Sequence, residues 1–117
     1  MDLTQSEIKQ YQENALELIR KTVLKYIPCD DYAVFLFGSR AGDSPRRTSD
    51  FDIGVYGKEN LPGTVWGDVN EELENLNIPY LVDVIDFSKT SDEFKAIALK
   101  KIILWNQPKN FKIYLPN

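Results

Sequence analysis

Two aspartates in one short apolar segment, with a third in a later segment, are suited to binding a divalent cation. Asp50 and Asp52 lie two positions apart in Asp-Phe-Asp-Ile-Gly-Val-Tyr, and Asp83 lies in Leu-Val-Asp-Val-Ile-Asp. Alternate side chains of a strand share a face, so Asp50 and Asp52 would lie together and repel each other when ionised. Mg²⁺ prefers a few carboxylate oxygens plus waters and substrate phosphates. We therefore predict that Asp50, Asp52 and Asp83 form a catalytic site for one or two Mg²⁺ ions.

The third carboxylate has a competitor, because Asp86 follows Asp83 in the same segment. An aspartate among apolar neighbours is costly to bury without compensation, and a shared metal would compensate Asp83. Strand parity puts Asp86 on the opposite face, near the strand end. We interpret Asp86 as a turn or cap residue.

A glycine and a serine follow the first apolar segment directly and are suited to binding phosphate. Gly38 allows a tight turn and close approach of a phosphate to backbone amides, and Ser39 can donate hydrogen bonds. Arg40 adds a positive charge, and Ser49 offers a further contact just before Asp50. We predict that Gly38, Ser39, Arg40 and Ser49 bind the phosphates of a nucleotide.

Hydrophobic spacing predicts the elements that hold these residues. Helices are expected at 5–27, 64–77 and 91–105, strands at 32–37, 50–56 and 80–87, and a short edge strand at 111–115. Thr4 or Ser6, Thr64 and Ser91 are candidate helix N-caps. This order predicts a single domain over residues 1–117, an α/β (α+β) fold with a small mixed sheet, helices on one face and the other face open.

Composition excludes several kinds of chemistry. The chain has 117 residues and no histidine, which removes Ser-His-Asp and Cys-His catalysis and most zinc sites. We predict a cytoplasmic protein without membrane contact for three reasons. Cys29 is the only cysteine, the chain does not start with a basic stretch followed by an apolar one, and no apolar run approaches the ~20 residues of a membrane helix. A net charge of -4 argues against broad nucleic-acid binding.

Taken together, these segments resemble the polymerase-beta-like nucleotidyltransferases, and among them the minimal nucleotidyltransferase (MNT) family. The matching segments are, in chain order, Phe-Leu-Phe-Gly-Ser-Arg-Ala, Thr-Ser-Asp-Phe-Asp-Ile-Gly-Val and Val-Asp-Val-Ile-Asp. The resemblance covers roughly residues 5–105, and it implies the family's palm-like fold. Family members usually carry a second arginine after Ser-Arg-Ala, where this chain has Gly42 and Asp43. Arg46 or Arg47 is a candidate replacement, although each arginine taken singly is more readily interpreted as a solvated loop charge.

The resemblance implies transfer of a nucleoside monophosphate, favouring AMP from ATP. It also implies the antitoxin role in HEPN–MNT toxin–antitoxin pairs, with a tyrosine of a small helical HEPN partner as acceptor. Three rival hypotheses remain: a nucleotide-binding antitoxin that neutralises its partner by docking alone, a small-molecule nucleotidyltransferase, and a nucleotidyltransferase acting on nucleic acid. The last two usually carry domains for which this chain has little length. The acceptor, the base preference, the choice between Mg²⁺ and Mn²⁺ and the oligomeric state stay open.

Overall fold

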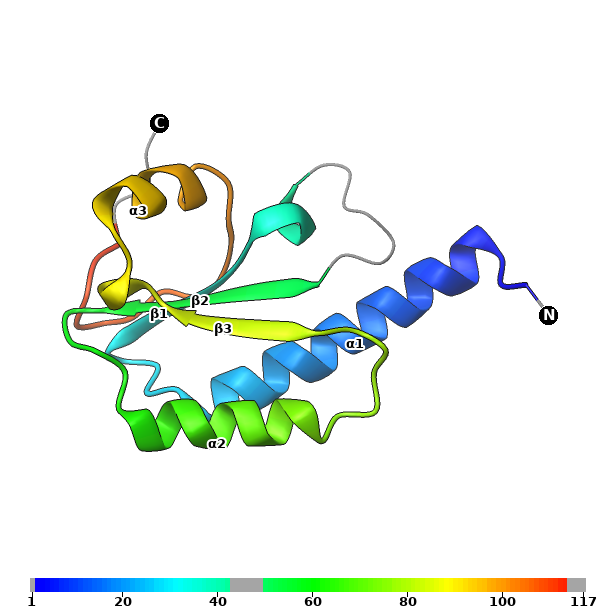
Figure 1. Cartoon of the computed structure of the whole chain (residues 1–117), viewed down its shortest axis with the longest axis horizontal. Coiled ribbons are helices and arrows are strands. Elements are labelled where there is room, and N and C mark those ends of the chain that lie inside the picture. The colour runs from blue at the N-terminus through cyan, green and yellow to red at the C-terminus, as the bar shows by residue number, and fades with distance from the viewer. Residues whose placement is uncertain (1, 43–49, 114–117) are drawn as a thin grey trace.

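The fold is built on a four-stranded mixed sheet with the strand order β3-β2-β1-β4 (Figure 1). The structure is a computed structural model and describes residues 2–42 and 50–113. Its strands are β1 (Tyr32–Phe37), β2 (Phe51–Gly57), β3 (Val82–Asp86) and β4 (Ile103–Asn106). β1 pairs antiparallel with β2 and β4, whereas β2 pairs parallel with β3. The mixed sheet predicted from the sequence is therefore confirmed.

Two long helices, α1 (Gln5–Tyr26) and α2 (Gly63–Glu74), cover one face of this sheet (Figure 1). Alternate residues of a strand point to one face of the sheet, and an amphipathic helix has one apolar stripe. The apolar stripes of both helices pack against the alternate residues of three strands that point toward them. The buried residues of this layer include Ile19, Val23, Val34, Ile53, Val55, Val69, Leu73 and Val84. The N-terminal part of α1 extends past the sheet in Figure 1, and there Tyr11 is 59% exposed although the stripe predicted it to pack.

The predicted helix caps are confirmed in two of three cases. The Thr4 side chain accepts a hydrogen bond from the Glu7 amide, and Glu7 reciprocates, so α1 begins with a capping box. The Ser91 hydroxyl accepts from the Phe94 amide at the start of α3 (Asp92–Ala98). The prediction of Thr64 was wrong, because α2 begins at Gly63 with Pro62 at its N-cap.

The opposite face of the sheet carries a second, largely aromatic cluster. Phe87 contacts Phe35 and Phe37 edge-to-face, with ring centroids 4.8 and 5.0 Å apart. The other buried residues of this cluster are Ala33, Leu99 and Ile113. The expectation that helices lie on one face holds for α1 and α2, whereas the short α3 lies over this second face (Figure 1). The face expected to be open is therefore partly covered.

The third predicted helix, 91–105, was wrong in its second half. The helix ends at Ala98, and Ile103–Asn106 forms β4 instead. All six residues of β1 are buried, so this strand needs a pairing partner on each side, and β4 supplies the second. The edge strand predicted at 111–115 is absent at 111–113, where the chain is irregular, and residues 114 and 115 lie outside the described part.

Two glycines differ in the space around them and give a test of this packing. A β-carbon on Gly54 would overlap the ring of Phe35 on the neighbouring strand, whereas nothing lies within 4 Å of one on Gly67 in α2. We expect Gly54→Ala to lower the free energy of unfolding by about 1–3 kcal/mol through overpacking. The matched Gly67→Ala should raise it by about 0.5–1 kcal/mol, since alanine is the better helix former. Urea denaturation measures both, and equal effects would contradict the packing described.

Candidate active site

The sheet topology brings the predicted phosphate loop and two of the predicted carboxylates to one end. Because β1 and β2 are antiparallel, Phe37 at the end of β1 is the register partner of Asp52 near the start of β2. Because β2 and β3 are parallel, Asp52 is in turn the partner of Asp83. Gly38 follows Phe37 directly, so Gly38, Asp52 and Asp83 lie at the same end of three neighbouring strands.

Gly38 is required by both its conformation and its surroundings. Its φ of +73° lies in the left-handed region that side chains disfavour. A β-carbon at this position would overlap the Oδ2 atom of Asp52. The tight turn predicted at Gly38 is therefore present, and it places the backbone directly against the Asp52 carboxylate, a contact that the sequence did not reveal.

The three aspartates differ in exposure. Asp52 is half-buried, whereas Asp50 and Asp83 are exposed. The expectation that Asp83 is buried among apolar neighbours was wrong, because β3 is an edge strand and Asp83 lies near its start. Burial raises the pKa of Asp52 above its ordinary value, and the negative charges of Asp83 and Asp50 raise it further.

This accumulated negative charge is what a bound cation would offset. Within residues 2–42 and 50–113, no three acidic, cysteine or histidine side chains stand as a ready-made set of metal ligands. Mg²⁺ does not need one, because it is commonly held by one or two carboxylates together with waters and substrate phosphates. The oxygen-only donor set and the charge that raises the Asp52 pKa therefore fit Mg²⁺.

Asp86 has the structural role that strand parity predicted. It is buried and accepts hydrogen bonds from the amides of Leu61 and Ser88 at 2.8 and 3.0 Å. It thereby caps the short 3₁₀ helix η2 (Phe87–Lys89). These bonds leave Asp86 on the opposite face from Asp83.

The four residues after β1 form a 3₁₀ helix, η1 (Gly38–Ala41), in which Ser39 and Arg40 have different surroundings. Ser39 is exposed beside Gly38, as a phosphate-binding residue must be. Arg40 is only 8% exposed, with its guanidinium 4.4 Å from the Phe51 ring centroid and 5.1 Å from that of Tyr80. Burial lowers the pKa of Arg40, and the charges of Tyr80 and Asp50 act in the opposite direction.

Arg40 therefore anchors the loop to the sheet, a role that the sequence did not reveal. Phe51 and Tyr80 stand 11 and 40 positions after Arg40, so no local motif links the three residues. Phosphate binding by Arg40 stays a prediction. The predicted contact from Ser49, and the candidate replacements Arg46 and Arg47, lie outside the described residues.

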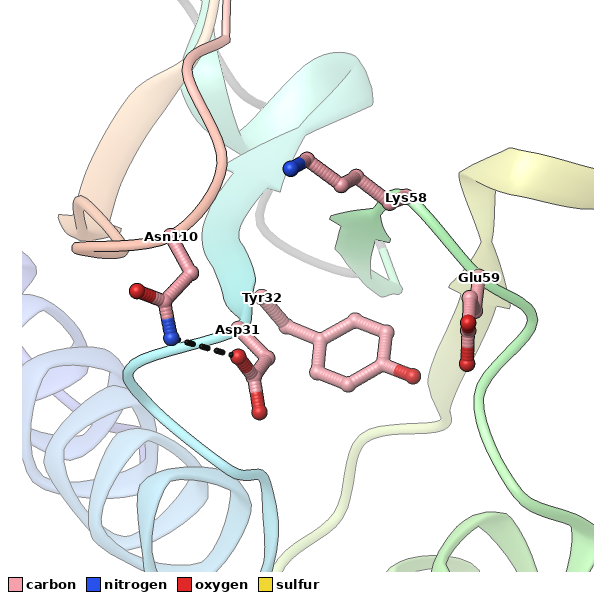
Figure 2. Close-up of a pocket in the computed structure, with 5 residues that line it drawn as sticks. All are labelled: Asp31, Tyr32, Lys58, Glu59 and Asn110. Atoms are coloured by element: carbon pink, nitrogen blue, oxygen red, sulfur yellow. Dashed lines mark hydrogen bonds between the residues drawn. The ribbon is translucent and has the colours of Figure 1, made fainter.

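A separate polar pocket of about 300 Å³ lies at the other end of β1 and β2 (Figure 2). It is lined by Asp31, Tyr32, Lys58, Glu59 and Asn110, and Figure 2 shows the Asn110 amide donating to Asp31 at 2.8 Å. Tyr32 is the first residue of β1, whereas the candidate active site begins after its last residue. This pocket is therefore separate from the aspartates.

Comparisons with known proteins identify similar sequences. Residues 30–110 match the family described as polymerase beta, nucleotidyltransferase. A probable protein adenylyltransferase, MntA, from Haemophilus influenzae is 30% identical over 86 residues, which is 74% of this chain and 75% of that protein.

Solved structures with the same fold include toxin–antitoxin complexes. A mutant MntA–HpeT complex has a TM-score of 0.60 at 21% identity, covering 77% of this chain and 72% of that one. A toxin–antitoxin structure with AMP-PNP has a TM-score of 0.59 at 24% identity, covering 80% and 73%. A tri-AMPylated Shewanella oneidensis HEPN toxin with its MNT antitoxin has a TM-score of 0.55 at 22% identity, covering 82% and 72%. At these identities the structures establish the fold.

The stacking of Arg40 gives a first prediction for the site. Lysine keeps the charge but lacks the planar group that lies over the rings of Phe51 and Tyr80. We expect Arg40→Lys to lower the free energy of unfolding by about 1–2 kcal/mol, measured by urea denaturation. Arg20→Lys on α1, where the arginine only pairs with nearby Glu17, is the matched control and should change stability little.

The raised pKa of Asp52 gives a second prediction. An acid with a raised folded-state pKa stabilises the fold fully below its unfolded-state value of 3.8, and this stability is lost as pH rises through the folded-state value. We expect Asp52→Asn to remove this loss and therefore to melt at a higher temperature than wild type at pH 7, with the difference shrinking toward pH 3.8. Thermal melts across this pH range measure the effect. Glu71→Gln, at an exposed carboxylate of α2, controls for the change in net charge, and a pH-independent difference would contradict the prediction.

Proposed function

Because the chain belongs to the polymerase beta nucleotidyltransferase family, we propose that it transfers AMP from ATP to a protein acceptor. The observation that carries this proposal is the close approach of Gly38 to Asp52, with Asp83 in register beside it. Phosphoryl-type transfer is mainly a matter of positioning and charge stabilisation, which a phosphate loop next to carboxylates that hold a cation would supply. The Haemophilus relative, a probable protein adenylyltransferase, supports AMP and a protein acceptor.

We further propose that the acceptor is a tyrosine of a small helical HEPN-type partner and that the chain acts as its antitoxin. Solved relatives of the same fold include an MNT antitoxin in complex with a tri-AMPylated HEPN toxin, and a toxin–antitoxin structure with AMP-PNP. A tyrosine hydroxyl is a suitable acceptor, because it loses one proton as it bonds to phosphorus.

In the proposed reaction, the acceptor oxygen bonds to the α-phosphorus of ATP while the bond from that phosphorus to the bridging oxygen of the β-phosphate breaks. AMP is then joined to the acceptor and pyrophosphate leaves. Gly38 and Ser39, with Ser49 and Arg40, would hold the β- and γ-phosphates through amide, hydroxyl and charged contacts. Asp83, exposed at the start of β3, would accept the proton of the attacking hydroxyl.

Asp50, Asp52 and Asp83 would hold Mg²⁺, which when bound supplies neutralisation of the triphosphate charge and activation of the acceptor hydroxyl. The support for this assignment is the negative charge that the three carboxylates bring together around Asp52. Asp52 is held against the Gly38 backbone and is therefore the most firmly positioned of the three.

The central prediction concerns Asp52. We expect Asp52→Ala to reduce transfer by at least about a thousandfold, because loss of metal-supported charge stabilisation costs several kcal/mol and about 1.4 kcal/mol corresponds to each tenfold change in rate. The assay incubates the purified chain with α-labelled ATP, Mg²⁺ and the protein encoded by its neighbouring gene. Label on the partner that depends on Asp52 would support the proposal.

Asp2→Ala, which removes an exposed carboxylate ahead of α1, is the matched control and should transfer at the wild-type rate. Transfer by Asp52→Ala at the wild-type rate would show the mechanism to be wrong. If no label appears but both wild type and Asp52→Ala bind the partner tightly, the chain neutralises its partner by docking alone.

A further inference from the structure

A groove of about 510 Å³ lies between α2 and the edge strand β3, next to the candidate active site. Trp66 and Glu74 line it from α2, and Tyr80, Leu81 and Asp83 line it from the chain that leads into β3. Asp83, the residue proposed to accept the proton of the attacking hydroxyl, is therefore among the residues that line the groove, and the groove adjoins the candidate active site. β3 has a strand on only one side among the described residues, so this groove lies along a free edge of the sheet.

The walls of the groove are apolar and held in place. Leu81 is 70% exposed and Trp66 is 46% exposed, although both are large apolar side chains. The Trp66 indole donates to the carbonyl of Val84 at 3.1 Å, which fixes its ring against the edge of β3. Tyr80 contacts Phe51 edge-to-face, with ring centroids 5.3 Å apart, and also contacts Arg40. Rigid aromatic side chains of this kind favour contact with another apolar or aromatic side chain.

The charged residues that line the groove are acidic. Every charged residue from 59 to 88, the stretch that contains α2 and β3, is an aspartate or a glutamate. Glu74 and Asp83 belong to the groove itself. The six lysines of residues 89–113 follow β3 in the chain, in the part that includes α3 and β4. A groove with this charge attracts positively charged segments and repels negatively charged ones.

We propose that this groove binds the acceptor, and that the acceptor is a positively charged protein segment carrying the tyrosine that receives AMP. The tyrosine ring and the aliphatic stems of neighbouring lysines or arginines lie on Trp66, Tyr80 and Leu81, while the basic groups face the carboxylates. The tyrosine hydroxyl is then presented where the groove meets the candidate active site, at the lining residue Asp83. This inference rests on the proposed function, whose site it extends from the nucleotide to the acceptor.

Binding can be measured without transfer, because Trp66 lies in the groove and the only other tryptophan is Trp105 on β4. In a Trp105→Phe protein, Trp66 fluorescence reports occupancy of the groove. The probe is a short synthetic peptide of lysines around one tyrosine, and its counterpart replaces each lysine with glutamate. We expect a saturable change in fluorescence with the lysine peptide and none with the glutamate peptide.

Leu81 and Ile97 form a matched pair, since each is 70% exposed and Ile97 lies on α3 over the other face of the sheet. Leu81→Lys removes apolar contact and adds a repelling charge, so the Kd for the lysine peptide should rise at least about tenfold. Ile97→Lys makes the same change of residue type and should alter the Kd by less than about twofold. Glu74→Lys should act in the same direction as Leu81→Lys. Equal weakening by the Leu81 and Ile97 variants would show nonspecific attraction to an acidic protein and overturn the proposal.

Failure of this inference is distinguishable from failure of the proposed function. Transfer of label to the partner without sensitivity to Leu81→Lys would leave the AMP transfer intact and place the acceptor elsewhere. A response of Trp66 to the lysine peptide that depends on Leu81, with no label on any protein, would support the groove as a binding site for basic segments and contradict the transfer reaction.

Discussion

The Asp52 carboxylate lies against the backbone of Gly38, in space that a β-carbon would occupy. The residue that makes this contact follows a fully buried strand directly and has a left-handed backbone conformation, which glycine adopts without strain. It also takes the carboxylate partly out of water, while Asp50 and Asp83 add negative charge nearby. A phosphate loop can then lie directly over the carboxylate because nothing but backbone separates them.

Successive side chains of β2 point to opposite faces of the sheet, so one face carries core residues and the other carries Asp52. Phe51, Ile53 and Val55 point toward α1 and α2 and are at most 2% exposed, so this face anchors the strand. Asp52 points the other way, and the aromatic cluster around Phe87 packs on that second face. A shift of one residue in the pairing of β2 would bury the carboxylate and expose the core, so the fold and the site depend on the same register.

The sequence was sufficient for the features that depend on local pattern. Alternation in Asp50–Tyr56 correctly separated core from carboxylate positions, and parity distinguished Asp83 from Asp86. It failed where tertiary pairing decided the outcome: residues 103–106 join β1 as a strand because β1 is buried on both sides, although their spacing also suited a helix. The contacts of Arg40 could not be predicted from the sequence for a similar reason, because Phe51 and Tyr80 are distant from it in the chain and approach it only in the folded structure. The metal-binding and phosphate-binding roles of the site residues remain predictions.

Tyr80 belongs to two surfaces at once, because its ring contacts Arg40 in the loop after β1 and also lines the groove along β3. Any ligand that reorients this ring changes the geometry at the other surface as well. Affinities at two such surfaces are thermodynamically linked: whatever factor one ligand imposes on the second, the second imposes on the first. If the proposed nucleotide and acceptor sites are both occupied, Tyr80 is thus a residue through which binding at one would be felt at the other.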